Sequence, residues 1–237
     1  MNANALFACL DPRKAIWQLG PLPAAVGRVM LVGWQVTPPP RDAGVPAVIA
    51  AVLARALTSV ARVTFAGTVA DPPATASWTP CGADLIRGLD AGGYLERIGR
   101  VIKSASSAVT LVSTRSPETA IRLFEEPNYP WWLQGQVALL SEPDAPPPDI
   151  DRQRFLALLG DDWAARAAAL AVTGFRGILR PGVDGDLAGI LSLSEESERE
   201  LLTALERAAG QAGLDWMPLT EDAFATALSS YKKKRRR

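Results

Sequence analysis

Cys81 and the acidic turn at Asp184 are the positions in this sequence where residue type and spacing could support chemistry. Cys81 follows a proline and precedes an expected helix over residues 82–90, whose positive N-terminal end would favour a reactive thiolate. Asp184 and Asp186 flank Gly185, as at the start of an oxygen-ligand loop for a divalent ion. Simpler readings are a buried structural cysteine and a tight hairpin turn, and the sequence favours these over a nucleophile and a metal site.

The absence of histidine limits the chemistry more than any residue that is present. None of the 237 residues is a histidine, which removes the usual general base, the usual activator of a nucleophile and the commonest zinc ligand. No phosphate-binding glycine loop is present either, since the expected strand that contains Gly33 runs into Trp34, Gln35 and then prolines. We therefore expect no cofactor, no metal and no catalytic residue.

An adjacent pair of tryptophans is the best candidate for a binding surface. Trp131 and Trp132 begin an expected strand over residues 131–140, where neighbouring side chains point to opposite faces. Both can be buried only in a sheet covered on both sides. If one face is open, an exposed tryptophan beside Tyr129 and Gln134 is typical of a binding hot spot.

The charge of the chain is divided between an acidic body and a basic end. The last six residues supply six of the 25 basic side chains, so the remainder has 19 against 25 acidic ones, a formal charge of −6. Such a body suits a basic protein partner. The basic end could instead hold nucleic acid or an anionic membrane, or be a solvated tail of natural or artificial origin. It consists of Lys232, Lys233, Lys234, Arg235, Arg236 and Arg237.

Composition and length indicate a soluble globular protein with a sizeable core. The apolar share is 48% and the charged share 21%, values ordinary for such proteins. No apolar run approaches the roughly 18 residues of a membrane span. The first ten residues lack the basic start of a secretory signal, so we expect a cytoplasmic location.

Residues 175–219 contain the clearest secondary-structure pattern. Two apolar runs flank the turn over residues 181–186, which predicts a hairpin. Ser194 and the glutamates after it predict a helix start, apolar residues at helical spacing continue it, and Gly213 predicts its end. A returning strand over residues 214–219 and a final helix complete the pattern.

The rest of the chain contains two further strand-helix-strand patterns. The first runs from a strand at Val29 through a helix after Pro46 to a strand at Arg62, and the second covers residues 108–140 with Ser116 as helix cap. The expected fold is α/β, with a mixed, mostly parallel sheet built from these units and a C-terminal hairpin-helix-strand-helix segment.

The expected organisation has two halves and a tail. Residues 1–142 form an N-terminal α/β half, residues 143–150 a proline-rich linker-like segment, residues 151–230 a C-terminal α/β half packed on the first, and residues 231–237 the basic tail. The function expected by exclusion is a non-catalytic protein-interaction module, such as an adaptor, a chaperone-like factor or an inhibitor or immunity-type protein. The alternative is a histidine-independent enzyme that uses carboxylates or Cys81 on a small molecule.

Overall fold

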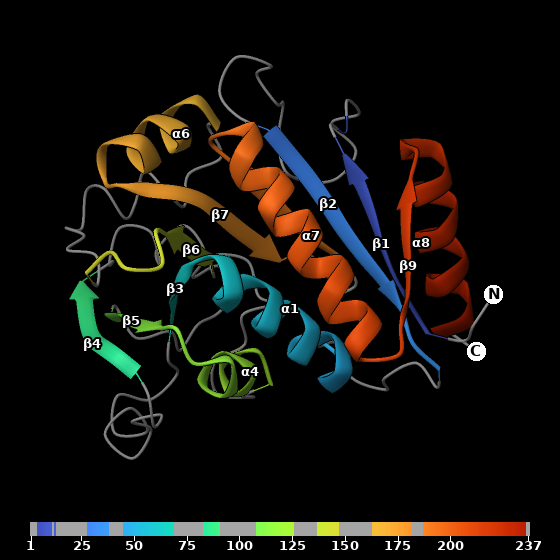
Figure 1. The fold of residues 1–237 in the computed structure, drawn as a ribbon, viewed down its shortest axis with the longest axis horizontal. Helices are drawn as coiled ribbons and strands as arrows, with labels where there is room; N and C mark the ends of the chain where they lie inside the picture. Colours follow the sequence, from blue (N-terminus) through green and yellow to red (C-terminus); the bar gives the residue numbers. More distant parts are fainter. Residues whose placement is uncertain are drawn as a thin grey trace.

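The residues that the structure describes form one nine-stranded sheet with helices on both faces (Figure 1). The structure is a computed structural model that describes residues 4–10, 12, 28–37, 45–68, 83–90, 108–125, 137–146, 163–181 and 187–235. The strands are β1 (Ala5–Leu10), β2 (Arg28–Gln35), β3 (Arg62–Thr68), β4 (Ala83–Asp90), β5 (Ala108–Thr114), β6 (Val137–Ser141), β7 (Phe175–Pro181), β8 (Leu187–Ser192) and β9 (Asp215–Leu219). The helices are α1 (Ala47–Val60), α4 (Pro117–Glu125), α6 (Trp163–Val172), α7 (Glu195–Gln211) and α8 (Glu221–Arg235).

Alternating side chains on the central strands pack into two separate hydrophobic cores, one on each face of the sheet. In β2, Met30 and Val32 face the core beneath α1, α4 and α7, while Val29 and Leu31 face the core beneath α6 and α8. A strand covered on both faces needs apolar residues at nearly every position, which explains the apolar run from Val29 to Trp34. The strand expected at Val29 is confirmed.

The sheet is mostly antiparallel, so the predicted mostly parallel sheet is wrong. The strand order is β4-β5-β3-β6-β7-β8-β2-β1-β9, and β1 with β9 is the one parallel pair between described strands. Each strand-helix-strand unit does join strands that run in the same direction. Strands from elsewhere in the chain lie between them: β6, β7 and β8 separate β2 from β3, β3 separates β5 from β6, and β2 and β1 separate β8 from β9.

Two strands differ from the sequence-based expectation. Residues 82–90 were expected to be helical, because Leu85, Ile86 and Leu89 fit helical spacing, but Ala83–Asp90 forms the strand β4 and pairs with β5. An apolar run this short fits both the helical spacing and the alternation of a strand. The expected elements began after residue 27, yet Ala5–Leu10 forms β1, with Leu6 and Phe7 fully buried on opposite faces between β2 and β9.

The helix ends follow the predicted capping residues. The Ser194 hydroxyl accepts a hydrogen bond from the Ser197 amide at 3.1 Å, and the Ser116 hydroxyl accepts one from the Thr119 amide at 3.1 Å. Gly213 has a φ of 70°, the left-handed conformation that ends a helix without strain at glycine. These local signals are sound because capping depends on residues within one turn.

Two antiparallel strand pairs meet at the centre of the sheet. The β1–β2 pair and the β7–β8 pair join through β2 and β8, and each pair is followed by a helix, α1 or α7, on the same face. α1 and α7 pack against each other across this face (Figure 1). Within the described residues, no helix combines the length and the apolar character needed to cross a membrane.

Candidate functional site

A groove of about 530 Å³ opens where the last turn of α1 approaches α7. Its walls are the end of α1, the chain just after β6, one side chain of β7 and the outer face of α7. We call it the α7 groove, and its lining residues are Ser59, Val60, Glu142, Pro143, Arg176, Arg199, Glu200, Thr203, Ala204 and Arg207.

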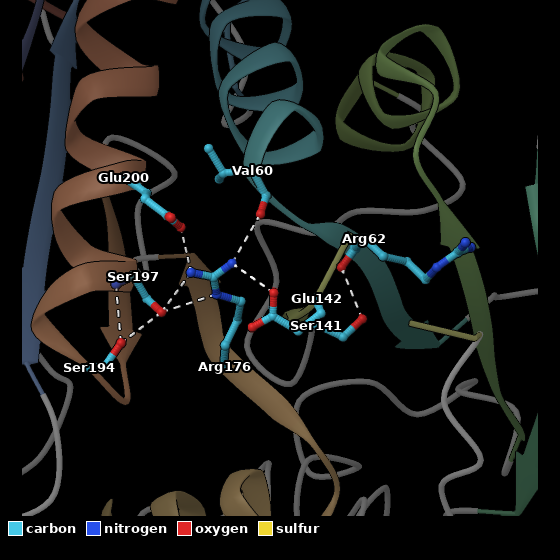
Figure 2. Close-up of polar contacts among 8 residues, drawn as sticks. All are labelled: Val60, Arg62, Ser141, Glu142, Arg176, Ser194, Ser197 and Glu200. Atoms are coloured by element: carbon cyan, nitrogen blue, oxygen red, sulfur yellow. Dashed lines mark hydrogen bonds and ion pairs between the residues drawn. The ribbon is translucent and has the colours of Figure 1, made fainter. Parts of the chain in front are cut away.

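Arg176 of β7 forms the floor of the groove and joins three elements (Figure 2). Its Nε and Nη2 donate to the Ser197 hydroxyl at 3.0 and 2.9 Å, and Nη2 also donates to Glu200 Oε2 at 2.5 Å. Its Nη1 donates to the Val60 carbonyl and to Glu142 Oε2, both at 3.3 Å. A guanidinium carries five N–H donors, so each donor of Arg176 has an acceptor within the protein.

The position of Arg176 suits the ends of two helices at once. The Val60 carbonyl lies in the last turn of α1, where backbone carbonyls lack helical partners and the helix dipole favours a cation. On α7, Ser197 and Glu200 are three residues apart and therefore share one face of the helix. Because its side chain is only 17% exposed, these bonds hold Arg176 in a fixed orientation.

A hydroxyl network extends this floor to the start of α7. The Ser194 hydroxyl caps the helix and also donates to the Ser197 hydroxyl at 2.9 Å (Figure 2). The Ser197 hydroxyl oxygen thus accepts hydrogen bonds from Ser194 and from Arg176. The N-terminal turn of α7 is therefore fixed to the floor of the groove.

The outer rim of the groove has two exposed guanidinium groups. Arg199, Thr203 and Arg207 follow one another at intervals of four and so lie along one face of α7. The Thr203 hydroxyl is turned back to the Arg199 carbonyl at 3.0 Å. Among the residues that the structure describes, neither Arg199 nor Arg207 has an ion-pair partner. Their charges are available to a negatively charged ligand.

The opposite side of the first turn of α7 holds a buried carboxylate. Glu198, whose side chain is 6% exposed, accepts from Arg28 Nε of β2 at 2.5 Å through Oε2. Its Oε1 is buried without a hydrogen-bond partner among the described residues. Glu195 lies 3.9 Å from Arg28 Nη1. We assign this pair a structural role, because it ties the first turn of α7 to β2 of the sheet.

Most site residues expected from the sequence lie outside the described residues, and their roles stay predictions. These are Cys81, Tyr129, Trp131, Trp132, Gln134, Asp184 and Asp186. At the basic end, the backbone of α8 continues through Lys232, Lys233 and Lys234 to Arg235, so the helix extends into the segment expected to be a separate tail. In the residues described here, no three acidic, cysteine or histidine side chains gather as metal ligands.

The groove residues were missed because their signal is weak in the sequence. The spacing of Arg199, Thr203 and Arg207 is readable, but on an exposed helix face such a pattern is ordinary. Comparison with protein-family models, with curated proteins and with solved structures gave no match. The assignment of a function therefore depends on the groove itself.

Proposed function

We propose that this protein is a non-catalytic, cytoplasmic interaction module that binds another protein through the α7 groove. The observation that carries the proposal is that the groove arginines differ in their hydrogen bonding. Arg176 has spent all five donors on protein acceptors, whereas Arg199 and Arg207 are exposed and unpaired within the described residues. A rigid floor with free charges on its rim suits recognition of a surface.

The groove chemistry supports binding over catalysis. Its two carboxylates, Glu142 and Glu200, both accept hydrogen bonds from Arg176 and are 66% and 43% exposed. The same guanidinium holds both carboxylates, and both are open to solvent, whereas the acid or base of an active site is typically shielded from water. Cys9 is buried with its thiol in the reduced form, which fits a reducing compartment.

The charge of the groove changes the expected partner. The acidic composition of residues 1–231 suggests a basic protein, but the free charges at the groove are cationic and favour an acidic one. Complementary charge at the contact itself governs specificity, so the groove is the better guide.

A photocrosslinking residue placed in the groove tests the proposal. Thr203 on α7 and Thr226 on α8 are both exposed, and each hydroxyl is bonded to the carbonyl four residues earlier. A crosslinker at position 203, but not at 226, should trap a discrete protein in lysate of the source cells. Equal labelling at both positions, or adducts with small molecules alone, would contradict a protein-binding groove.

A further inference from the structure

The spacing of the two rim guanidinium groups indicates what shape of ligand can reach both. Arg199 and Arg207 are eight residues apart on α7, which corresponds to about 12 Å along a helix at 1.5 Å per residue. A single phosphate or carboxylate is much smaller than this distance and would contact one of them. A ligand that engages both must carry at least two negative groups on an extended frame.

We propose that the α7 groove binds an extended peptide segment with acidic residues four positions apart, an inference that rests on the interaction role proposed above. An extended chain rises about 3.3 Å per residue, so four residues span about 13 Å and place both acidic side chains on one face. This spacing matches the separation of Arg199 and Arg207 along the helix axis.

The floor of the groove adds a second requirement. Glu142 and Glu200 each give one oxygen to Arg176 and keep further acceptor capacity towards solvent. A peptide can place amide or hydroxyl donors against these carboxylates between its two acidic side chains. The expected ligand is therefore acidic at its ends and hydrogen-bond donating in the middle.

The same carboxylates disfavour a nucleic-acid strand. A strand carries a negative charge on every nucleotide, and phosphates between the two arginines would lie near Glu142 and Glu200. Single-stranded nucleic acid also depends on aromatic side chains for stacking. None of the described residues that line the groove is aromatic. The observations thus favour a peptide over a polynucleotide.

Titration of the full-length, isotope-labelled protein with defined probes tests this inference. The first probe is a twelve-residue Gly/Ser peptide with glutamates at positions 4 and 8, and the second has glutamine at both positions. We expect the glutamate peptide to shift the amide resonances of Thr203 and Glu200 and to leave Thr226 unchanged. The glutamine peptide should give much smaller shifts.

Charge variants show whether the rim arginines are responsible. Neutralising both, as Arg199→Gln with Arg207→Gln, should weaken binding of the glutamate peptide about fivefold to tenfold, in line with two exposed ion pairs. Arg122→Gln, an exposed arginine on α4, is the matched control and should leave the affinity unchanged. An equal unfolding midpoint for all variants verifies that the fold is intact.

Several results would overturn the inference without touching the wider proposal. Equal binding of the two peptides, equal loss in the Arg122 control, or tighter binding of a twelve-nucleotide DNA strand would each reject an acidic peptide ligand. A protein trapped at Thr203 would still support the interaction role in those cases. Absence of both the Thr203 crosslink and binding of the glutamate peptide would reject the wider role as well.

Discussion

Gly33 lies where two aromatic rings leave no room for a side chain. A Cβ atom at this position of β2 would come within 2.5 Å of Phe7 Cε2 and 3.1 Å of Phe224 Cζ. The two rings meet edge to face with centroids 5.2 Å apart, and both are fully buried. We expect Gly33→Ala to lower the free energy of unfolding by about 1–3 kcal/mol, because the core must shift to admit one methyl group. Urea denaturation measures the change.

Gly210 in α7 provides the control for this prediction. A Cβ atom there meets no heavy atom within 4 Å, so Gly210→Ala adds a methyl group in open space. Alanine is favoured over glycine inside a helix, and the substitution should raise the free energy of unfolding by about 0.5–1 kcal/mol. Opposite signs at the two positions would support the steric account of Gly33, and a loss of equal size at both would contradict it.

Arg176 is a residue whose structural role depends on donor geometry as well as on charge. Lysine at this position keeps the positive charge but has three donors on one atom, so it cannot reach α1, α7 and the chain after β6 together. We expect Arg176→Lys to cost about 1–3 kcal/mol of stability, since several bonds are lost together and two of the acceptors, the Val60 carbonyl and the Ser197 hydroxyl, are partly buried. Arg122→Lys should change stability by less than about 0.5 kcal/mol in the same denaturation experiment. A similar small effect at Arg176 would show that charge alone suffices there.

The role of Arg176 could not be predicted from the sequence. Within its strand it reads as one polar residue between apolar ones, and its partners Val60, Glu142 and Ser197 lie 116, 34 and 21 residues away. Local patterns report which face a residue occupies. They carry no information on which distant carbonyl or carboxylate it will meet.

At the scale of elements, α4 should respond to pH through its first turn. The pKa of Glu118 lies below its ordinary value of 4.5, first because of a backbone hydrogen bond and then because of its bond with the Ser116 hydroxyl. A carboxyl group whose pKa falls on folding stabilises the folded helix above 4.5, and this contribution is lost as the pH drops through the lower folded value. We therefore expect the start of α4 to fray below pH 4.5 before the sheet unfolds.

Hydrogen exchange of the Thr119 and Ala120 amides measures this fraying. Glu118→Gln should remove the pH dependence of the Thr119 and Ala120 protection below pH 4.5, because the glutamine side chain does not titrate. Ser116→Ala should weaken protection at every pH, with a loss of about 1 kcal/mol typical of a helix cap. Protection in wild-type protein that stays constant down to pH 3 would contradict the assigned role of Glu118.

Helices were more predictable than strands in this chain. The starts of α4 and α7 and the end of α7 follow from Ser116, Ser194 and Gly213, each acting within one turn of chain. β1 was missed and β4 was assigned as helix, because a short apolar run acquires its strand character from pairing partners. For β1, those partners are β2 and β9, which come from opposite ends of the sequence.

At the scale of the whole molecule, the order of the strands in the sheet could not be predicted from the sequence. The three strand-helix-strand units were recognised, and each joins strands that point the same way. A hydrophobic pattern shows that two strands are connected by a helix, but it does not show how many other strands lie between them. Because β7 and β8 lie between β6 and β2, the two halves of the chain interleave in one sheet.

This interleaving predicts that the N-terminal half cannot fold alone. Residues 1–146 include β1 to β6, but without β7 and β8 they leave two separate sets of paired strands, β4-β5-β3-β6 and β2-β1. The core under α1 would also lose the buried Leu201 and Leu205 of α7. We expect this fragment to lack cooperative unfolding by circular dichroism, and we expect addition of residues 147–237 to restore it.

A cleavable version of the full chain separates loss of strands from loss of chain continuity. A protease site introduced within residues 147–150 allows the folded protein to be cut between the two halves. We expect the cut pieces to stay associated and to unfold in one transition, because the β6–β7 and β2–β8 hydrogen bonds and the α1–α7 contact remain. Dissociation into a folded 1–146 fragment would show that the central strands are dispensable and would contradict a single cooperative sheet.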